Sequence, residues 1–514
     1  AERLYLDDSV SMNHFLVRVE KEDTNTVAYG LSWGRDSVSR QNTHGNFEGL
    51  LHFLPEGGMR LELQDFGLQT GEFSWRSYPD GYVLIKPRFL SMHHVGMFTL
   101  GDSNGISLEG VVSHDPNSTL KMRFTHFDLS YLEFFLRKIP MKIDTWVDGT
   151  AELRDLYGDF LFDARLRMKD LAINGHPYGQ GSLKASYYKG EAVHAAFEVV
   201  REREGSRTGK TILSMDGKYY PAMRHKMDFT GYASELPVGF LDKIVSAMAE
   251  DLSGLADGKI RLGGTLRSPE LSVDAVCKDF AATISMMNTR YSFAELPVRL
   301  TSSQIVFPSS RFVDQEFNTA GRFSGKILHR NFQDIRLDLN IDFNNLLALN
   351  KTRGIDLPFW GTVFATGMLD VEGPAEDILL RLNAQVADNS DLSFDVSNPA
   401  GGSGANFITF KVPQEPVRDS GRLSLEKYYA RNRAAAHRKG KITLDFNLEI
   451  TPGLLVSVRL RNASMDGLLT ATGRGALRMY MADDNPQLFG TYVINGGGFD
   501  FSMMNLLNKR FSLK

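Results

Sequence analysis

Histidines close to acidic residues are the first feature of this sequence that could do chemistry. His93 and His94 lie near Asp102, and Asp115 follows His114. His and Asp side chains are common metal ligands. Successive side chains on a strand point to opposite faces, however, so an adjacent pair of histidines cannot easily chelate one ion. We therefore expect no metal site here.

The single cysteine is the second candidate. Cys277 cannot form an intrachain disulfide, and it shares the apolar phase of Leu271, Val273 and Ala275. This alternation predicts a buried thiol on a strand rather than a nucleophile.

The sequence motifs of common catalytic sites are missing. There is no Gly-x-Ser-x-Gly, no His-Glu-x-x-His, no Walker loop and no dinucleotide-binding glycine pattern between a strand and a helix. The glycine runs at 400–404 and 495–498 lie between strand patterns and are better explained as hairpin turns. The paired carboxylates of a glycosidase stay open as an alternative, because convergence in space cannot be seen from sequence. We expect no enzyme and no cofactor.

Composition indicates an ordered protein rich in strands. Hydrophobic residues make up 42% of the 514 residues, and 47 Gly against 18 Pro suit many strands joined by tight turns. The net charge of −4 gives no basic field, so no nucleic acid partner is expected. No apolar run is long enough for a membrane-spanning helix. The chain opens at Ala1 without a signal peptide, which we interpret as a piece whose targeting information lies outside it.

Alternation of apolar and polar residues is clearest between residues 332 and 386. A period of two places one set of side chains on one face of a strand, so one face is apolar and the other polar. The same period returns between residues 441 and 450. The apolar set is Ile335, Leu337, Leu339, Ile341, Phe343, Ile378, Leu380, Leu382, Ile442, Leu444, Phe446, Leu448 and Ile450.

Glycines recur about every hundred residues, which is typical of an array of repeat units. Each unit must contain several strands, and amphipathic patterns at 130–139 and 235–244 predict short helices at the start of two units. A Gly-x5-Gly frame occurs in the last three copies, whereas the first copy has Asp155 at the second position. The repeat glycines are Gly149, Gly258, Gly264, Gly361, Gly367, Gly467 and Gly473.

These repeats suggest a domain organisation. We predict an N-terminal strand array over 1–126, repeat units over 127–234, 235–330 and 331–440, and a truncated C-terminal strand repeat over 441–514. The segment 419–441 is rich in Lys and Arg and looks like a basic insertion. It is either a solvated surface element or a contact for anionic lipid headgroups.

The C-terminal residues carry the most specific resemblance. The stretches ITLDFNLEITP (442–452), GRGALRM (473–479), LFGTYVI (488–494) and GFDFS (498–502), with FWGTVFATG (359–367), resemble the C-terminal domain of the TamB (translocation and assembly module) family. This family belongs to the AsmA-like group of bridge-like lipid transfer proteins, and the likeness is to its Bacteroidota members. Family chains usually begin with an inner-membrane anchor and continue past Lys509-Arg510-Phe511, so the resemblance implies a partial chain.

The resemblance implies an all-β fold: a long, repetitive, single-layer antiparallel sheet curled into an open trough (a β-taco), with a few short amphipathic helices. It implies a bridge across the periplasm of a diderm bacterium, anchored in the inner membrane and paired with an Omp85-family (TamA-like) outer-membrane partner. The family is associated with phospholipid transport and with outer-membrane protein assembly. The apolar set above would then be a lipid groove, because acyl chains are a physically sensible cover for an apolar face.

Two other interpretations stay open. Any half-buried sheet alternates in this way, so the apolar faces could pack on each other as ordinary β-sandwiches in a structural envelope module. Alternatively, open sheet edges could receive client strands, which would make the protein a chaperone or scaffold for outer-membrane protein assembly.

Overall fold

The computed structural model describes most of the chain, and the structural statements below concern the described part. It comprises residues 3–7, 10–13, 16–34, 44–70, 73–78, 80–99, 104–129, 142–188, 192–202, 209–246, 249–266, 268–353, 359–395, 441–461, 465–482, 485–503 and 507–513. The predicted helix at 130–139 and the basic insertion, apart from Lys441, lie outside these ranges.

The protein is all-β, as predicted. About 80% of the described residues lie in strands. The described part of the chain has one short α-helix, α2 (Asp242–Val245), which follows a 3-10 turn, η2 (Gly239–Leu241). No helix in the described ranges is long and apolar enough to cross a membrane.

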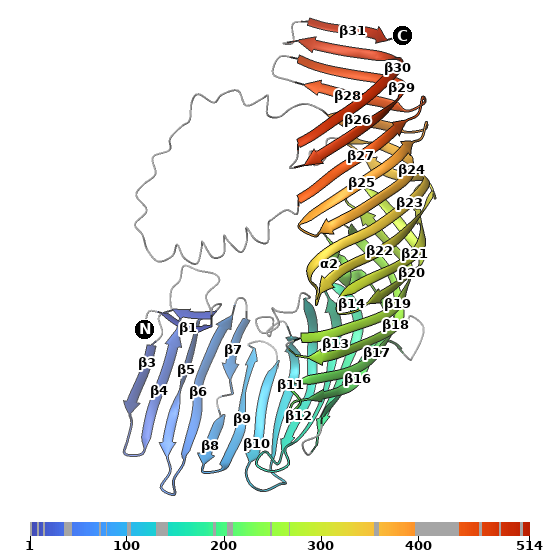
Figure 1. Ribbon diagram of the computed structural model, residues 1–514. Coiled ribbons are helices and arrows are strands. Elements are labelled where there is room, and N and C mark those ends of the chain that lie inside the picture. The colour runs from blue at the N-terminus through green and yellow to red at the C-terminus, as the bar shows by residue number, and fades with distance from the viewer. Residues whose placement is uncertain are drawn as a thin grey trace. The chain divides into compact units, whose positions relative to one another are not determined.

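The chain divides into two compact units, and in each of them consecutive strands lie side by side (Figure 1). Unit 1 comprises residues 1–240 and 259–270, and unit 2 comprises residues 241–258 and 271–514. Strands β18 (Ala249–Thr265) and β19 (Ser268–Ile284) contribute residues to both. The boundaries of the repeat units stay predictions.

Unit 1 is built from antiparallel neighbours. From β3 to β17 each strand pairs with the next along the chain, except that two short strands, β7 and β8, together fill one place between β6 and β9. A separate hairpin joins β1 to β2. The strands are β1 (Arg3–Asp7), β2 (Val10–Asn13), β3 (Leu16–Lys21), β4 (Thr26–Trp33), β5 (His44–Phe53), β6 (Met59–Thr70), β7 (Phe73–Ser77), β8 (Tyr82–Lys86), β9 (Phe89–Thr99), β10 (Gly105–Val112), β11 (Thr119–Asp128), β12 (Ile143–Arg154), β13 (Leu161–Ile173), β14 (His176–Tyr187), β15 (Val193–Arg201), β16 (Lys210–Tyr220) and β17 (Lys226–Pro237).

Unit 2 continues the same plan with several longer strands. The prediction of an antiparallel sheet is confirmed for the run, but two pairs are parallel: β25 with β27, and β26 with β28. The strands are β20 (Thr289–Leu300), β21 (Gln304–Asp314), β22 (Ala320–Arg330), β23 (Gln333–Lys351), β24 (Phe359–Pro374), β25 (Asp377–Val386), β26 (Asp391–Asp395), β27 (Lys441–Ile450), β28 (Leu455–Arg461), β29 (Met465–Ala482), β30 (Asn485–Met503) and β31 (Leu507–Leu513).

Polar residues in a left-handed backbone conformation mark places where strands bend. Asp170 and Asn345 have φ of 52° and 49°, and a register shift with a neighbouring strand accompanies each of them. A bulge of this kind adds one residue to one strand and increases its twist. Asn and Asp tolerate this conformation better than most residues, so the bends are specified locally.

The predicted helix at 235–244 starts later than the sequence indicated. β17 continues to Pro237, and the helical residues begin at Gly239. The Tyr178 hydroxyl donates to the carbonyl oxygen of Pro237 (3.0 Å) and accepts from the N–H of Phe240 (3.2 Å). These tertiary hydrogen bonds fix the start of the segment, an effect that local propensity cannot anticipate.

Candidate functional site

In unit 2 the predicted apolar residues form rows that cross the sheet. Opposed residues on neighbouring antiparallel strands share a face, so the register places Ile341, Leu382 and Phe446 in one line. The row runs through Phe323, Ile341, Leu369, Leu382, Phe446 and Met479, on β22, β23, β24, β25, β27 and β29.

Nearly the whole predicted set belongs to one hydrophobic cluster. Ile335 is the exception: 37% of its surface is exposed, and it lies near the start of β23 beside Asp334, whose φ is 52°. The buried members of the set are Leu337, Phe343, Ile378, Leu380, Leu444, Phe446, Leu448 and Ile450, and Leu339, Ile341, Leu382 and Ile442 are partly buried against them.

A line of bends divides the strands of unit 2 into two wings. The first wing comprises residues 335–343, 367–374, 377–386, 441–450 and 473–482, and the second wing comprises residues 346–351, 359–365, 391–395, 455–461 and 465–472. The register shifts at the boundary in β23 and again before Gly473 in β29. Strands β25 and β27 end at the same line, and short connections lead from them to β26 and β28. The interruptions of these strands are therefore aligned across the sheet.

The repeat glycines lie where backbones approach closely. A Cβ added at Gly367 would overlap the carbonyl oxygen of Asn383, and one at Gly473 would overlap that of Val493. The second glycines of the last two Gly-x5-Gly frames, Gly367 and Gly473, thus lie on the bend line. Carbonyl oxygens also crowd the added Cβ at Gly149, Gly258, Gly264 and Gly361, whereas Gly467 is a buried residue within β29. The first copy lacks a second glycine because β12 ends at Arg154, so Asp155 is in a turn.

The apolar faces of the two wings pack against each other. The ring of Phe359 on the second wing lies 6.4 Å from that of Phe446 on the first, and both belong to the same cluster. Leu444 on the first wing and Leu454 at the bend have 0% of their surface exposed. Buried side chains of both wings therefore belong to one hydrophobic cluster.

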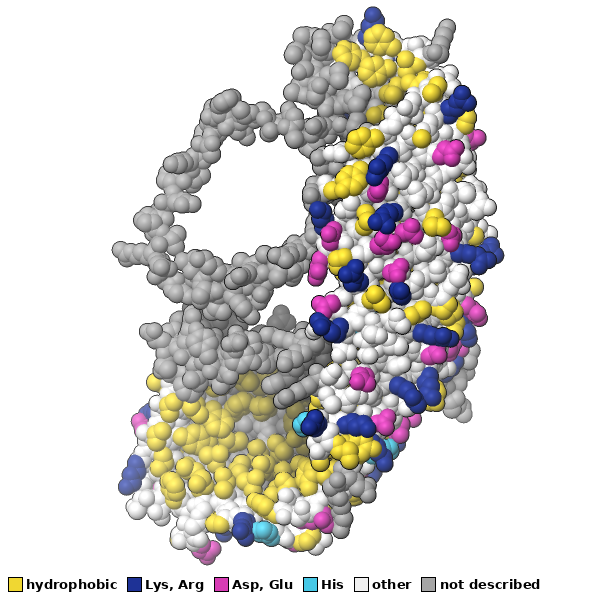
Figure 2. All heavy atoms as spheres, viewed as in Figure 1, with side chains coloured by type: hydrophobic (Ala, Val, Ile, Leu, Met, Phe, Trp, Pro, Cys, Tyr) yellow, Lys and Arg dark blue, Asp and Glu magenta, His cyan; other side chains and the backbone are white. Residues whose placement is uncertain are grey.

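In unit 1 comparable rows are partly open. One row runs across nine strands with Leu183 opposite Phe197, and most of its members are half-buried rather than buried. Hydrophobic side chains gather over β4–β10 in Figure 2. The row comprises Met97, Ile106, Phe124, Gly149, Leu166, Leu183, Phe197, Met215 and Gly231, and a parallel row comprises Val95, Leu108, Met122, Ala151, Ala164, Ala185, Ala195, Gly217 and Phe229.

Apart from Gly149, the predicted site residues did not include these rows of unit 1. The signal was available, because Phe162, Ala164, Leu166 and Met168 alternate with polar residues as clearly as the residues of β23 do. Only the register shows that such alternation lines up over nine strands.

The opposite face of unit 2 is held by polar pairs. The Arg478 guanidinium forms two contacts with the Asp445 carboxylate (2.8 and 3.0 Å), and Arg381 donates to Glu372 (2.9 Å). Such exposed pairs contribute little stability each, but they keep this face hydrated.

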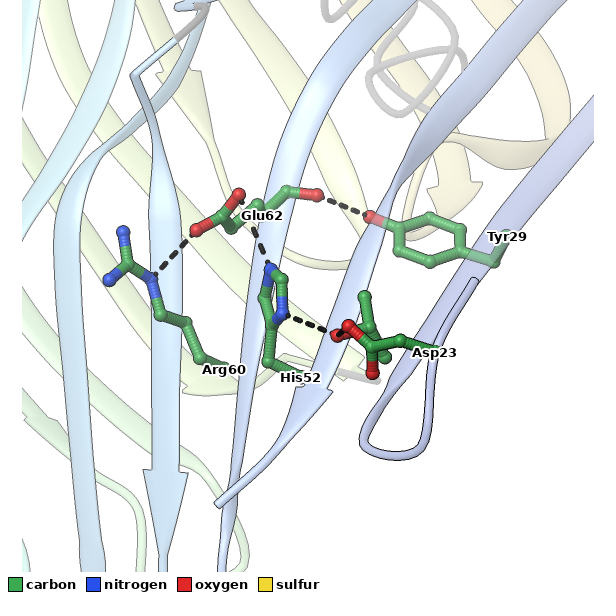
Figure 3. A network of polar contacts seen from close by, with 6 residues as sticks. Asp23, Tyr29, His52, Arg60 and Glu62 are labelled. Carbon is green, nitrogen blue, oxygen red and sulfur yellow. Dashed lines mark hydrogen bonds and ion pairs between the residues drawn. The ribbon is translucent and has the colours of Figure 1, made fainter. Parts of the chain in front are cut away.

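A polar network joins β4, β5 and β6 in unit 1 (Figure 3). His52 shares a hydrogen bond between Nδ1 and Thr26 Oγ1 (3.1 Å), and its Nε2 lies 3.5 Å from Glu62 Oε2. Arg60 Nε lies 3.0 Å from Glu62 Oε1, and the Tyr29 hydroxyl donates to the Glu62 carbonyl oxygen (3.0 Å). Burial raises the pKa of Tyr29 to about 12. The groups bind one another across three strands, which indicates a structural role.

The histidine candidates pack on aromatic rings. His94 stacks on Tyr78 (ring centroids 4.0 Å apart) and its Nδ1 lies 2.8 Å from Asp80 Oδ1, an interaction that lowers the pKa of Asp80. His114 stacks on Tyr157, and Asp102 lies outside the described residues. In the part of the chain that the structure describes, no group of three or more His, Cys, Asp or Glu side chains could hold a metal ion.

Cys277 is a buried thiol on β19, as predicted, and burial raises its pKa to about 11. A thiol with such a pKa is protonated at neutral pH and is a poor nucleophile.

The strand pairing and the distribution of apolar side chains define the class of the protein. It is an all-β protein made from a long run of hydrogen-bonded strands that have one apolar and one polar face, an arrangement that fits a trough. Residues 311–514 match the family model of the TamB C-terminal domain, so this part of the chain is similar to the TamB family. The family is a non-enzymatic one of the cell envelope, with a part in outer-membrane protein assembly or lipid transport. A comparison with curated proteins found no match, and neither did one with solved structures.

Proposed function

We propose that this chain carries phospholipids along its apolar face, between the inner and outer membranes of a diderm bacterium. The observation that supports the proposal best is the pair of half-buried apolar rows in unit 1, which run across nine consecutive strands. A row of this kind offers acyl chains an uninterrupted apolar contact. We propose that the predicted groove residues of unit 2, which lie in the part that matches the TamB domain, also contact lipid.

The energetics favour a face of this shape as a conduit. Each methylene that leaves water gains about 0.8 kcal/mol, so a two-chain lipid of some thirty methylenes faces a barrier on the order of 20 kcal/mol in water. An apolar row that stays in contact with the chains removes most of that barrier. The proposal includes a periplasmic location and an Omp85-family partner, which the family resemblance supports, and it includes no cofactor.

A chaperone role for outer-membrane proteins is the second candidate. Strand β3, which pairs with β4, exposes Leu16 (59%), Val17 (56%) and Val19 (66%). An exposed strand of this kind can accept a further strand from a client.

Site-specific photo-crosslinking tests the lipid proposal. A crosslinker in place of Leu183 on the apolar row is expected to capture phospholipid in cells, whereas one in place of Lys184, the next residue on β14, is not. Equal capture at Leu183 and Lys184, or capture of unfolded outer-membrane protein alone at both, would contradict a lipid route and favour the chaperone.

A further inference from the structure

The second wing of unit 2 has a free edge at residues 346–351 of β23, where no strand in the described ranges pairs on the side away from β24. Hydrogen bonds from side chains and turns attach this edge to the rest of unit 2. β22 begins at Ala320, opposite Asn344, so residues 346–351 of β23 extend beyond it. The N–H of Leu347 donates to Thr319 Oγ1 (2.8 Å), and the carbonyl oxygen of Leu347 accepts from the Tyr291 hydroxyl (2.8 Å). Burial raises the pKa of Tyr291 to about 12, so the hydroxyl stays a donor.

Asn350 completes this attachment three residues further along. Its N–H donates to the carbonyl oxygen of Met287 (3.1 Å), and its own carbonyl oxygen accepts from Asn288 Nδ2 (2.7 Å). Its side chain donates to Glu316 Oε2 (2.6 Å). We call the contacts of Leu347 and Asn350 the latch. Side chains thus supply several bonds that a neighbouring strand would otherwise make.

The bend line supplies a hinge for the same wing. Asn345 sits in the left-handed region, and its N–H bonds to Thr366 Oγ1 (2.9 Å) on the next strand. Gly367, the ends of β25 and β27, and the register shift before Gly473 lie along the same line. The wing is therefore joined to the sheet along one line and fastened by the latch along another edge.

We propose that the second wing is a gate over the groove of unit 2, closed when the groove is empty and displaced by acyl chains. This inference rests on the proposed lipid-carrying function. In the closed state the wing covers the first-wing residues, of which Leu444 has 0% of its surface exposed. Parting the wings in water exposes both apolar faces, whereas parting them around acyl chains does not, because the chains replace the contacts of the opposite wing. Lipid binding and opening are therefore coupled.

Weakening the latch tests the gate. Tyr291→Phe removes one hydroxyl and keeps the ring, and Asn288→Gly removes the amide while suiting the φ of 53° at that position. We expect the amides of Leu347 and Asn350 to exchange with deuterium about tenfold faster in the double variant, because two hydrogen bonds of the wing are lost. Tyr291→Phe alone is the milder variant. Tyr29→Phe in unit 1, which also removes a hydroxyl bound to a backbone carbonyl, is the matched control.

Labelling with a phosphatidylglycerol that carries a diazirine in its acyl chain reports lipid entry. In the wild type we expect label on Leu183 and Phe197 of unit 1 and little on Leu380 and Leu444 of unit 2; in the latch variants label on unit 2 should rise several-fold. Equal labelling of both units in the wild type, or an unchanged unit 2 in variants whose exchange is faster, overturns the gate while leaving the conduit. Absence of label from unit 1 as well overturns the conduit itself.

Discussion

At the scale of single residues, glycine decides where strands can bend. Gly367 and Gly473 lie on the bend line, and a side chain at either would overlap a carbonyl oxygen of the next strand. The Gly-x5-Gly frame is thus a consequence of backbone proximity in the bent sheet rather than of a phosphate-binding loop.

We expect Gly367→Ala to destabilise unit 2 by about 1–3 kcal/mol, because the methyl group forces the backbones of β24 and β25 apart. Urea unfolding followed by fluorescence measures the change. Gly496→Ala is the control, since an added Cβ there meets nothing within 4 Å. Equal midpoints for the two variants would show that close approach does not constrain Gly367.

At the scale of elements, the aligned connections 387–390 and 451–454 lead from β25 to β26 and from β27 to β28, and so from the first wing to the second. The Gly453 N–H donates to Asp388 Oδ1 (2.8 Å), and the Thr451 hydroxyl donates to the carbonyl oxygen of Val386 (2.7 Å). The Thr451 side chain and the Gly453 N–H lower the pKa of Asp388. One carboxylate therefore couples the bends of two parallel strands.

This coupling predicts a pH dependence with a definite sign. Because the folded state lowers the pKa of Asp388, its contribution to stability is complete above the ordinary aspartate pKa of about 3.9 and is lost as the pH falls through the folded value. Asp388→Asn should lower the melting temperature of unit 2 at pH 7 and make little difference at pH 2. The residue is exposed, so the effect is small. The same difference at both pH values would argue against a role for the charge.

At the scale of the whole molecule, we expect a substitution at one position to affect lipid transport along the apolar face more than it affects folding. Each strand contacts mainly its neighbours, so a local change leaves the rest of the array folded. Lipid, by contrast, must pass every strand in series. A single polar constriction is therefore expected to stop flow without unfolding the chain.

Opposed charges in unit 1 test this expectation. Leu183→Glu with Phe197→Arg places an ion pair on the half-buried apolar row, where its hydration opposes the passage of acyl chains. We expect phospholipid transfer between vesicles to fall at least tenfold with unchanged circular dichroism. Lys184→Glu with Ala196→Arg places the same charges one residue along both strands, on the other face, and should transfer lipid normally. Equal loss in both variants would remove the row as the route.

This charge substitution is better made in unit 1 than at Leu339 and Ile341, the groove residues predicted from the sequence. Leu339 and Ile341 pack against the buried cluster between the wings, so charges there would disturb folding as well as passage. In unit 1 the row is half-buried, and charged side chains can stay hydrated.

The strands, their apolar and polar faces, and the burial of Cys277 could be predicted from the sequence alone. All three follow from a period of two, which is a local property of the chain. The sequence also located the glycines of the repeat frames, and the C-terminal stretches that lie within the match to the TamB domain.

Which apolar faces are covered could not be predicted in this way, because it depends on tertiary contacts. Leu339 in unit 2 and Leu183 in unit 1 have the same alternation, yet the first packs against a filled cluster between two wings and the second lies on a partly open row. The difference comes from aligned bends and from hydrogen bonds between residues far apart in the chain, such as Tyr291 with Leu347. Alternation in the sequence shows that one face of a strand is apolar. What covers that face depends on long-range contacts, which a local period does not encode.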